Sequence, residues 1–167
     1  MLLLKKKVEV NMSLRKIWID ADACPKMIKE VIFKACTREK IPVTLVANSY
    51  MQIPLAPMIN LIQVEKGADV ADFYIFKHCE VEDLVVTADI PLAKLIVDKG
   101  AIAINPRGEI YTEENISERL SMRDFMTELR DSGVVTGGPA PLGAKDKIAF
   151  TNSLDRLMTK MIKKLSI

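Results

Sequence analysis

Two apolar runs in this chain each stop at an aspartate, and each is followed by a proline at the start of a helical pattern. The first run ends at Asp20 before Pro25, and the second ends at Asp89 before Pro91. Short apolar runs that alternate with segments of helical periodicity are typical of buried parallel strands joined by crossover helices. Ligands bind beyond the carboxyl ends of the strands in an open sheet of this kind. The sequence therefore predicts an α/β fold with acidic groups at its ligand-binding edge.

The rest of the chain follows the same alternation until its last third, which contains only helical patterns. We expect an open, mainly parallel five-stranded sheet with helices on both faces and a C-terminal helical extension. The predicted strands are residues 16–20, 43–47, 61–64, 84–88 and 101–105, and the predicted helices are residues 25–40, 69–79, 90–99, 116–131 and 146–165. We treat residues 1–12 as an N-terminal tail and residues 13–167 as a single domain, in which residues 110–167 form the helical extension.

Composition narrows the range of partners and locations. Lys and Arg number 24 against 22 Asp and Glu, so a net charge of +2 does not by itself indicate a nucleic-acid-binding protein. No apolar run approaches the roughly 18 residues of a membrane span, so we expect no membrane segment. The three cysteines are widely spaced and match no zinc or redox pattern, which favours a cytoplasmic location. The apolar character of the C-terminal helices is compatible with a homodimer.

Carboxylates are the strongest chemical signal in the sequence. Asp20 and Asp22 follow the first predicted strand, Asp89 follows the fourth, and Asp69 and Asp72 share one face of the helix that begins near residue 69. Carboxylate oxygens are hard ligands that suit Mg²⁺ or Mn²⁺. A cation there would offset the repulsion among the acids, stabilise the fold, and bind more weakly below about pH 5 as the acids take up protons.

The same aspartates also have ordinary structural interpretations. Asp20 and Asp22 could cap the turn ahead of Pro25, Asp69 could be an N-cap, and Asp72 could be an exposed helix carboxylate. Two acidic strand ends on one sheet edge favour a functional site over these separate roles.

Groups that could hold a substrate phosphate are more scattered. Lys66 precedes the helix of Asp69, Asn48 ends the second predicted strand, Arg107 follows the fifth strand, and Arg123 lies on the helix predicted for residues 116–131. We predict these four as substrate-binding residues, although surface or turn roles would also account for them. No series of aromatic residues alternates with the basic ones, so the sequence does not indicate a stacking surface for single strands.

Six segments of the chain resemble motifs of the bacterial YaiI/YqxD family, whose members are uncharacterised. The segments are Ile17–Pro25, Gly67–Asp72, Thr87–Ala93, Asn105–Gly108, Met122–Met126 and Thr136–Pro139, and the resemblance covers about residues 15–160. A more distant similarity is to PIN-like nuclease domains, including the NYN group, which are typically Mg²⁺- or Mn²⁺-dependent ribonucleases. This second resemblance implies a PIN-like fold for residues 13–167, metal-binding roles for Asp20, Asp69 and Asp89, and supporting roles for Asp22 and Asp72.

The first functional hypothesis is therefore a divalent-metal-dependent nuclease that acts on RNA. In this hypothesis Asp20, Asp22 and Asp89 are catalytic, and Asp20, Asp69, Asp72 and Asp89 bind Mg²⁺ or Mn²⁺. The chain departs from many PIN-like relatives in one respect. Glu30 is the only nearby candidate for the acid that such relatives carry on the first helix.

Two alternatives remain open at this stage. Asp20-Ala21-Asp22 after the first strand is also similar to the signature of haloacid-dehalogenase-type phosphohydrolases, with Asp20 as nucleophile and Asp22 as acid/base. That family usually has threonine or valine at the position of Cys24. The third hypothesis is a non-catalytic module that binds RNA or a nucleotide.

Overall fold

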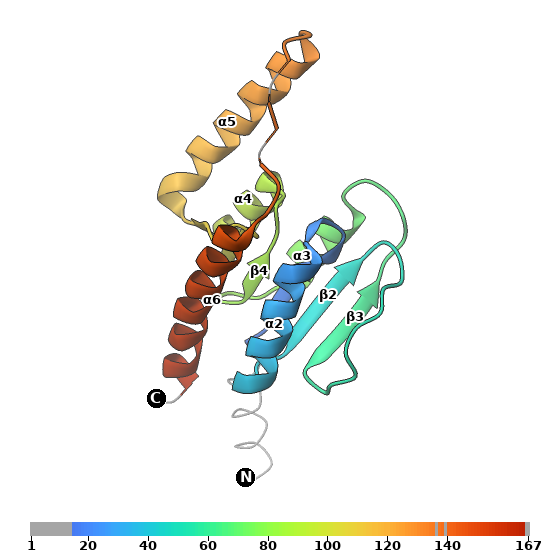
Figure 1. Ribbon diagram of the computed structural model, residues 1–167, viewed down its shortest axis with the longest axis vertical. Coiled ribbons are helices and arrows are strands. Elements are labelled where there is room, and N and C mark those ends of the chain that lie inside the picture. The colour runs from blue at the N-terminus through green and yellow to red at the C-terminus, as the bar shows by residue number, and fades with distance from the viewer. Residues whose placement is uncertain (1–14, 136, 139, 166–167) are drawn as a thin grey trace.

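The computed structural model describes residues 15–135, 137–138 and 140–165 (Figure 1). The N-terminal tail predicted for residues 1–12 lies outside the described residues, as do Thr136 and Pro139 of one of the family-like motifs.

The described chain forms an α/β fold around a six-stranded sheet with the order β3-β2-β1-β4-β5-β6. The strands are β1 (Ile17–Asp20), β2 (Val43–Ala47), β3 (Ile59–Gln63), β4 (Leu84–Val86), β5 (Ile102–Ile104) and β6 (Ile110–Tyr111). The first five strands pair in parallel, and β6 pairs antiparallel with β5. The chain adds strands on one side of β1 up to β3 and then crosses to β4 on the other side. The strand order therefore reverses between β1 and β4, which is where open α/β sheets form their ligand crevice.

Helices cover both faces of the sheet, as the sequence predicts. The helical elements are the short 3-10 turn η1 (Ala21–Ala23), α2 (Lys26–Glu39), α3 (Val70–His78), α4 (Ile90–Lys99), α5 (Glu113–Asp131) and α6 (Ala144–Leu165). Figure 1 shows α2 and α6 on the near side of the sheet and α3 and α4 behind it. The two layers have separate cores, because the strands are buried on both faces.

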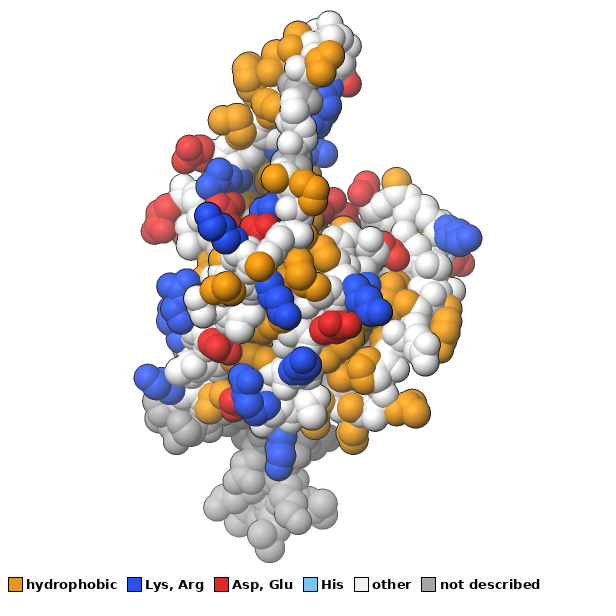
Figure 2. Space-filling view, viewed as in Figure 1, with side chains coloured by type: hydrophobic (Ala, Val, Ile, Leu, Met, Phe, Trp, Pro, Cys, Tyr) orange, Lys and Arg blue, Asp and Glu red, His pale blue; other side chains and the backbone are white. Residues whose placement is uncertain are grey.

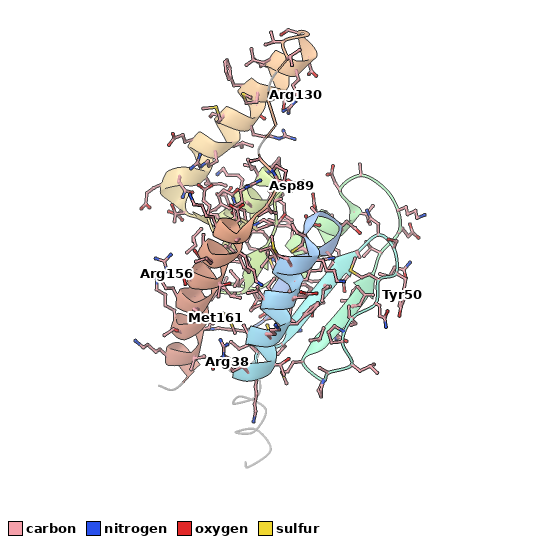
Figure 3. All side chains as sticks on the ribbon, in the orientation of Figure 1. Arg38, Tyr50, Asp89, Arg130, Arg156 and Met161 are labelled. Atoms are coloured by element: carbon pink, nitrogen blue, oxygen red, sulfur yellow. The ribbon has the colours of Figure 1, made fainter. Side chains whose placement is uncertain are left out.

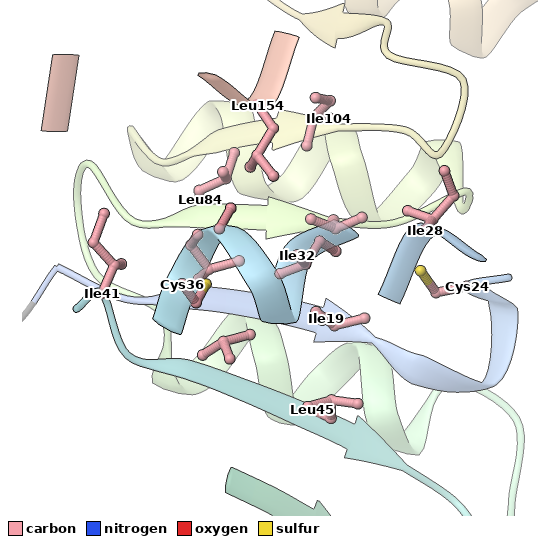
Figure 4. Close-up of a cluster of buried hydrophobic side chains, with 14 of the residues drawn as sticks. Ile19, Cys24, Ile28, Ile32, Cys36, Ile41, Leu45, Leu84, Ile104 and Leu154 are labelled. Atoms are coloured by element: carbon pink, nitrogen blue, oxygen red, sulfur yellow. The ribbon is translucent and has the colours of Figure 1, made fainter. Parts of the chain in front are cut away.

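The near core is built by α2 and α6. Ile28, Ile32 and Cys36 lie on one face of α2 and pack onto the inward side chains of the parallel strands, including Ile19 and Leu45 (Figure 4). The apolar face of α6 completes this core with Phe150, Leu154, Leu157, Met158 and Met161. The C-terminal helix is thus part of the main core.

The far core joins α3 and α4 to the opposite face of the same strands. Ala71 and Ile75 of α3 pack with Ile96 of α4 against Trp18 and Val85 of the sheet. Both helices begin at the carboxyl edge of the sheet, because each follows a parallel strand that ends there. Their first turns, and the acids on them, therefore lie close together.

The predicted and observed elements differ mainly in their bounds and in one strand. The sixth strand, β6, was not predicted, since two residues after a turn are too few to show alternation. Among the described residues, the part of the chain predicted as a helical extension (110–167) therefore contains a short edge strand and two helices, α5 and α6. Strand β4 ends at Val86, so Thr87 lies beyond it, and α5 begins at Glu113 because Thr112 and Asn115 form a capping box.

No helix in the described part of the chain has the length and apolar character needed to cross a membrane.

Candidate metal centre

Three carboxylates meet at the carboxyl edge of the sheet, next to the reversal in strand order. Oxygens of Asp69, Asp72 and Asp89 all lie within 4.8 Å of one another. Asp69 immediately precedes α3, Asp72 is on the first turn of α3, and Asp89 immediately precedes α4. Figure 3 shows Asp89 at the upper edge of the sheet, below the projecting α5. We call these three side chains the acidic cluster.

Asp89 is held by the backbone around the start of α4. Its Oδ1 accepts a hydrogen bond of 2.9 Å from the Leu92 N–H, so Asp89 is a true N-cap. Its own N–H donates to Thr87 Oγ1 at 3.0 Å. Asp89 therefore caps α4 with one oxygen, and its carboxylate also belongs to the acidic cluster.

Asp69 behaves differently, although it occupies the equivalent position before α3. Its side chain accepts no capping hydrogen bond, and its backbone is left-handed, with φ 64° and ψ 8°. Left-handed backbone is uncommon outside glycine, although Asp and Asn tolerate it best, and such residues occur often at functional sites. The N-cap interpretation therefore does not explain the side chain of Asp69.

Asp72 carries the clearest electrostatic signature of the cluster. Its partial burial and the neighbouring carboxylates of Asp89, Asp20 and Asp69 raise the pKa of Asp72 from 3.8 to about 7. A hydrogen bond between the Asp72 and Asp89 side chains contributes to this shift. The two carboxyl groups are thus close enough to share a proton when no cation separates them.

Asp20 lies behind the cluster and is not one of its three members. It is 6% exposed, and its Oδ2 accepts a hydrogen bond of 3.0 Å from Thr87 Oγ1. Burial raises the pKa of Asp20, the Thr87 hydroxyl lowers it, and the charges of Asp89 and Asp22 raise it further. Thr87 therefore links Asp20 to the backbone of Asp89, and Asp20 can orient the cluster without entering it.

Asp22 and Asn48 form a separate contact at the same sheet edge. Asp22 is exposed, and its Oδ2 accepts a hydrogen bond of 2.7 Å from the Asn48 N–H. This bond fixes the turn after β1 to the loop after β2. The side-chain Oδ1 of Asn48 is buried and has no hydrogen-bond partner among the described residues.

The cluster opens into a pocket of about 340 Å³ between α3, α4 and α5. Besides the three acids, Phe73, Leu95 and Arg123 line this pocket, together with further apolar side chains of α3 and α4. Arg123 is half exposed, and its Nη1 forms an ion pair of 3.2 Å with Oδ1 of the neighbouring Asp124. The structure therefore brings one of the four predicted substrate-binding residues to the acids.

The other two predicted cations, Arg107 and Lys66, do not line this pocket. Arg107 donates to Asp146 Oδ2 at 3.1 Å and to the Ala140 carbonyl, which ties the loop before α6 to the turn after β5. Lys66 is exposed in the loop that leads to Asp69. Glu30 is exposed on α2, on the other layer of the fold, and does not line the pocket of the cluster.

The sequence analysis does not single out three side chains at this edge, Thr87, Phe73 and Phe76. The predicted strand 84–88 includes Thr87, although a hydroxyl between a strand and an N-cap commonly accepts and donates local hydrogen bonds. Phe73 and Phe76 fall within the predicted helix 69–79, with no functional role assigned to them. The signal was available, because Asp69, Asp72, Phe73 and Phe76 follow the i, i+3, i+4, i+7 spacing of a single helix face.

The acidic cluster fits a small hard cation. Oxygens around an octahedral Mg²⁺ lie about 3 Å apart when adjacent and about 4 Å apart when opposite, so three oxygens within 4.8 Å would share one ion after their side chains draw closer together. Three carboxylates and the remaining positions for water or phosphate match the ligand set that Mg²⁺ and Mn²⁺ accept.

Comparisons with known proteins place the chain among bacterial relatives of similar length. A family model described as "Uncharacterized BCR, YaiI/YqxD family" matches residues 18–160. A UPF0178 protein of Shewanella halifaxensis is 59% identical over 145 residues, which cover 87% of this chain and 96% of the relative. A UPF0178 protein of Maridesulfovibrio salexigens is 55% identical over 150 residues, which cover 90% and 99%. Among solved structures, a homospermidine synthase from Legionella pneumophila in complex with NAD is 13% identical, with a TM-score of 0.45, over 75% of this chain and 35% of that one.

Proposed function

Since the chain belongs to the YaiI/YqxD family, whose activity is uncharacterised, we propose from its site that it is a divalent-metal-dependent nuclease that acts on RNA. The observation that carries the proposal is the convergence of Asp69, Asp72 and Asp89 at the point where the strand order reverses. Asp69 supports it most directly, because its backbone is left-handed and its side chain makes no capping hydrogen bond to α3.

Each residue at this edge has a distinct part in the proposal. Asp69, Asp72 and Asp89 would hold Mg²⁺ or Mn²⁺, which when bound supplies charge for a phosphoryl oxygen and lowers the pKa of water. Asp20 and Thr87 would fix the position of Asp89 through their hydrogen bonds.

Substrate binding would involve cations close to the cluster. Arg123 lines the pocket and would pair with a phosphodiester oxygen, while Lys66 on the neighbouring loop would add a second positive charge. Arg107 is engaged by Asp146 and the Ala140 carbonyl, which favours a structural role for it over a substrate contact. RNA as the partner and the cytoplasm as the location stay predictions.

The phosphohydrolase alternative receives less support from the geometry. A nucleophilic aspartate must present an oxygen to the phosphorus atom. Asp20 is only 6% exposed and does not line the pocket. Asp22 would be the acid/base of that alternative, but its Oδ2 already accepts a hydrogen bond from the Asn48 N–H. A non-catalytic RNA-binding module remains the second candidate, and the experiment below separates it from the nuclease.

The test compares the wild-type protein with Asp69→Asn and with the control Asp131→Asn. Asparagine tolerates the left-handed backbone of position 69, so the first variant removes a charge without adding strain. Asp131 is an exposed acid at the end of α5, outside the pocket. Calorimetry would measure Mn²⁺ binding, and a labelled single-stranded RNA would measure cleavage.

We expect Asp69→Asn to weaken Mn²⁺ binding about tenfold or more and to reduce cleavage on the order of a hundredfold. Asp131→Asn should match the wild-type protein in both assays. A wild-type protein that binds Mn²⁺ and RNA but cleaves nothing would favour the binding module. Equal Mn²⁺ affinity in all three proteins would refute the metal centre.

A further inference from the structure

The pocket beside the acidic cluster has two chemically different parts. The acids lie at the starts of α3 and α4, at the sheet edge. Phe76 follows Asp72 by four residues, which places it about 6 Å further along the helix. Leu95 lies further along α4 in the same way. The pocket thus runs from a carboxylate end to an apolar end over about one helical turn.

Phe73 is the aromatic side chain most open to solvent in this pocket. It is 64% exposed, and Leu95, across the pocket on α4, is 45% exposed. An exposed phenylalanine gains little from burial, so packing within the chain does not explain its place. One turn before it on the same helix face is Asp69, which is part of the acidic cluster.

Charge limits what can enter the pocket. Its lining holds three aspartates and one cation, Arg123, so an anion is repelled unless a divalent cation sits on the acids. A flat, uncharged ring meets no such barrier at the apolar end. The volume of about 340 Å³ is at the lower limit of the 300–1,000 Å³ typical of ligand pockets, which suits one small ring system.

We propose that the apolar end of this pocket receives one unpaired nucleobase of RNA, stacked on Phe73, while the adjoining phosphodiester lies on the acidic cluster beside Arg123. This inference rests on the proposed nuclease function and specifies its substrate as single-stranded RNA. A base inside a duplex is already stacked on both faces and paired at its edge. Entry into the pocket would therefore require unstacking, and duplex RNA should bind poorly.

The test measures binding of a fluorescein-labelled ten-nucleotide RNA to the wild-type protein, Phe73→Ala and Phe73→Tyr, in Ca²⁺ and in Mn²⁺. Phe125→Ala is the matched control, because Phe125 is 54% exposed on α5 and does not line the pocket. The same RNA annealed to its complement serves as the duplex probe. Since Phe73 is exposed, its substitution should leave the melting temperature unchanged.

We expect Phe73→Ala to weaken binding of the single strand about tenfold, which is in the range that stacking of one base supplies. Phe73→Tyr should bind as the wild-type protein does, and Phe125→Ala should have no effect. In cleavage assays with Mn²⁺, Phe73→Ala should raise KM and leave kcat within about twofold. Equal affinity of Phe73→Ala and Phe125→Ala, equal binding of duplex and single strand, or no binding of either RNA would overturn the proposal.

The two proposals fail in different ways. Single-strand binding that depends on Phe73 without any cleavage would support the base pocket and contradict the nuclease. Cleavage that depends on Asp69 but not on Phe73 would support the nuclease and contradict the base pocket.

Discussion

At the scale of single residues, the buried Asp83 and the partly buried Asp72 show how the surroundings of an aspartate distinguish a structural role from a functional one. Asp83 is 3% exposed, and its oxygens accept hydrogen bonds from the Lys16 N–H, the Trp18 indole N–H and the Glu80 N–H. These donors stabilise its charge and join β1 to the start of β4. Asp72 faces other carboxylates instead, which raise its pKa to about 7. Surrounding donors indicate a scaffold role, and surrounding acids indicate a cation site.

The raised pKa of Asp72 predicts how the metal-free protein responds to pH. Because the folded-state pKa of about 7 lies above the ordinary 3.8, the folded protein binds more protons than the unfolded chain between those values. The resulting stability is fully present below about pH 4 and is lost as pH rises through 7. Asp72→Asn should remove this dependence and raise the melting temperature at pH 8 by about 3 °C. Thermal unfolding in a chelating buffer at pH 5 and pH 8 measures both effects.

The same shift changes the expected pH dependence of metal binding. Asp72 must lose its proton to bind a cation, so Mn²⁺ affinity should begin to fall below about pH 7. The sequence analysis expects this weakening only below about pH 5, since the sequence does not show which acids lie together or that Asp72 is partly buried, and burial is the largest cause of its raised pKa. Constant affinity between pH 8 and pH 6 would contradict a role for Asp72 as a ligand.

At the scale of elements, the turn between β5 and β6 explains a motif that the sequence left ambiguous. Asn105 Oδ1 accepts hydrogen bonds from the Arg107 and Glu109 N–H groups, each at 3.0 Å. The Gly108 carbonyl accepts one from Ser153 Oγ of α6 at 2.6 Å. The segment Asn105–Gly108 therefore fixes the C-terminal helix to the sheet, which is a structural role.

Gly108 should be the least replaceable residue of this turn. Its φ is +89°, and an added Cβ would lie 2.6 Å from the Ala149 carbonyl carbon and 2.8 Å from the Phe150 nitrogen. Backbone atoms cannot move aside cheaply, so Gly108→Ala should lower the free energy of unfolding by about 3 kcal/mol. Gly133→Ala is the matched control, because its φ is +88° but no atom lies within 4 Å of the added Cβ.

Comparing Gly108→Ala with Gly133→Ala separates the cost of the packing clash from the cost of the left-handed backbone. Gly133→Ala should lose only about 1 kcal/mol, from the left-handed backbone. Urea unfolding followed by circular dichroism measures both variants. Similar losses for the two glycines would mean that the turn does not pack against α6 as described.

At the scale of the whole molecule, α5 extends away from the body formed by the sheet and the other helices. Figure 2 shows apolar side chains gathered over this projecting part. Met122, Phe125 and Val134 are each at least half exposed, and Val135 is 96% exposed. The helix is anchored near its start, where Ile116 is buried in the core with α4. Clustered apolar exposure of this kind is typical of surfaces that contact another chain.

The homodimer expected from the sequence stays a prediction, and α5 is now the place to test it. We expect the wild-type protein to sediment at twice the monomer mass at micromolar concentration. Replacing Met122 and Val134 together with glutamine should give a monomer, because it removes exposed apolar groups. Replacing the exposed Leu55 on the loop after β2 with glutamine is the control, and it should not change the mass. A monomeric wild-type protein would contradict the prediction.

The sequence by itself determined the layers of this protein and the list of its acids. Apolar runs and helical periodicity are local properties, so the parallel sheet, the helices on both faces and the strand-end aspartates could be read directly. It could not give β6, whose two residues form a strand only because β5 lies beside them. The sequence singles out five aspartates at this edge, yet it does not show which of them lie together.

Only the tertiary structure decided which aspartates meet. The crossing from β3 to β4 brings the starts of α3 and α4 together, so Asp69, Asp72 and Asp89 converge although 20 residues separate the first from the last. The same packing buries Asp20, which accepts a hydrogen bond from Thr87, and brings the Asn48 N–H to Asp22. It also places Arg107 in an ion pair with Asp146 of α6. Distances between side chains on different elements depend on how those elements pack, and no local pattern in the sequence contains that information.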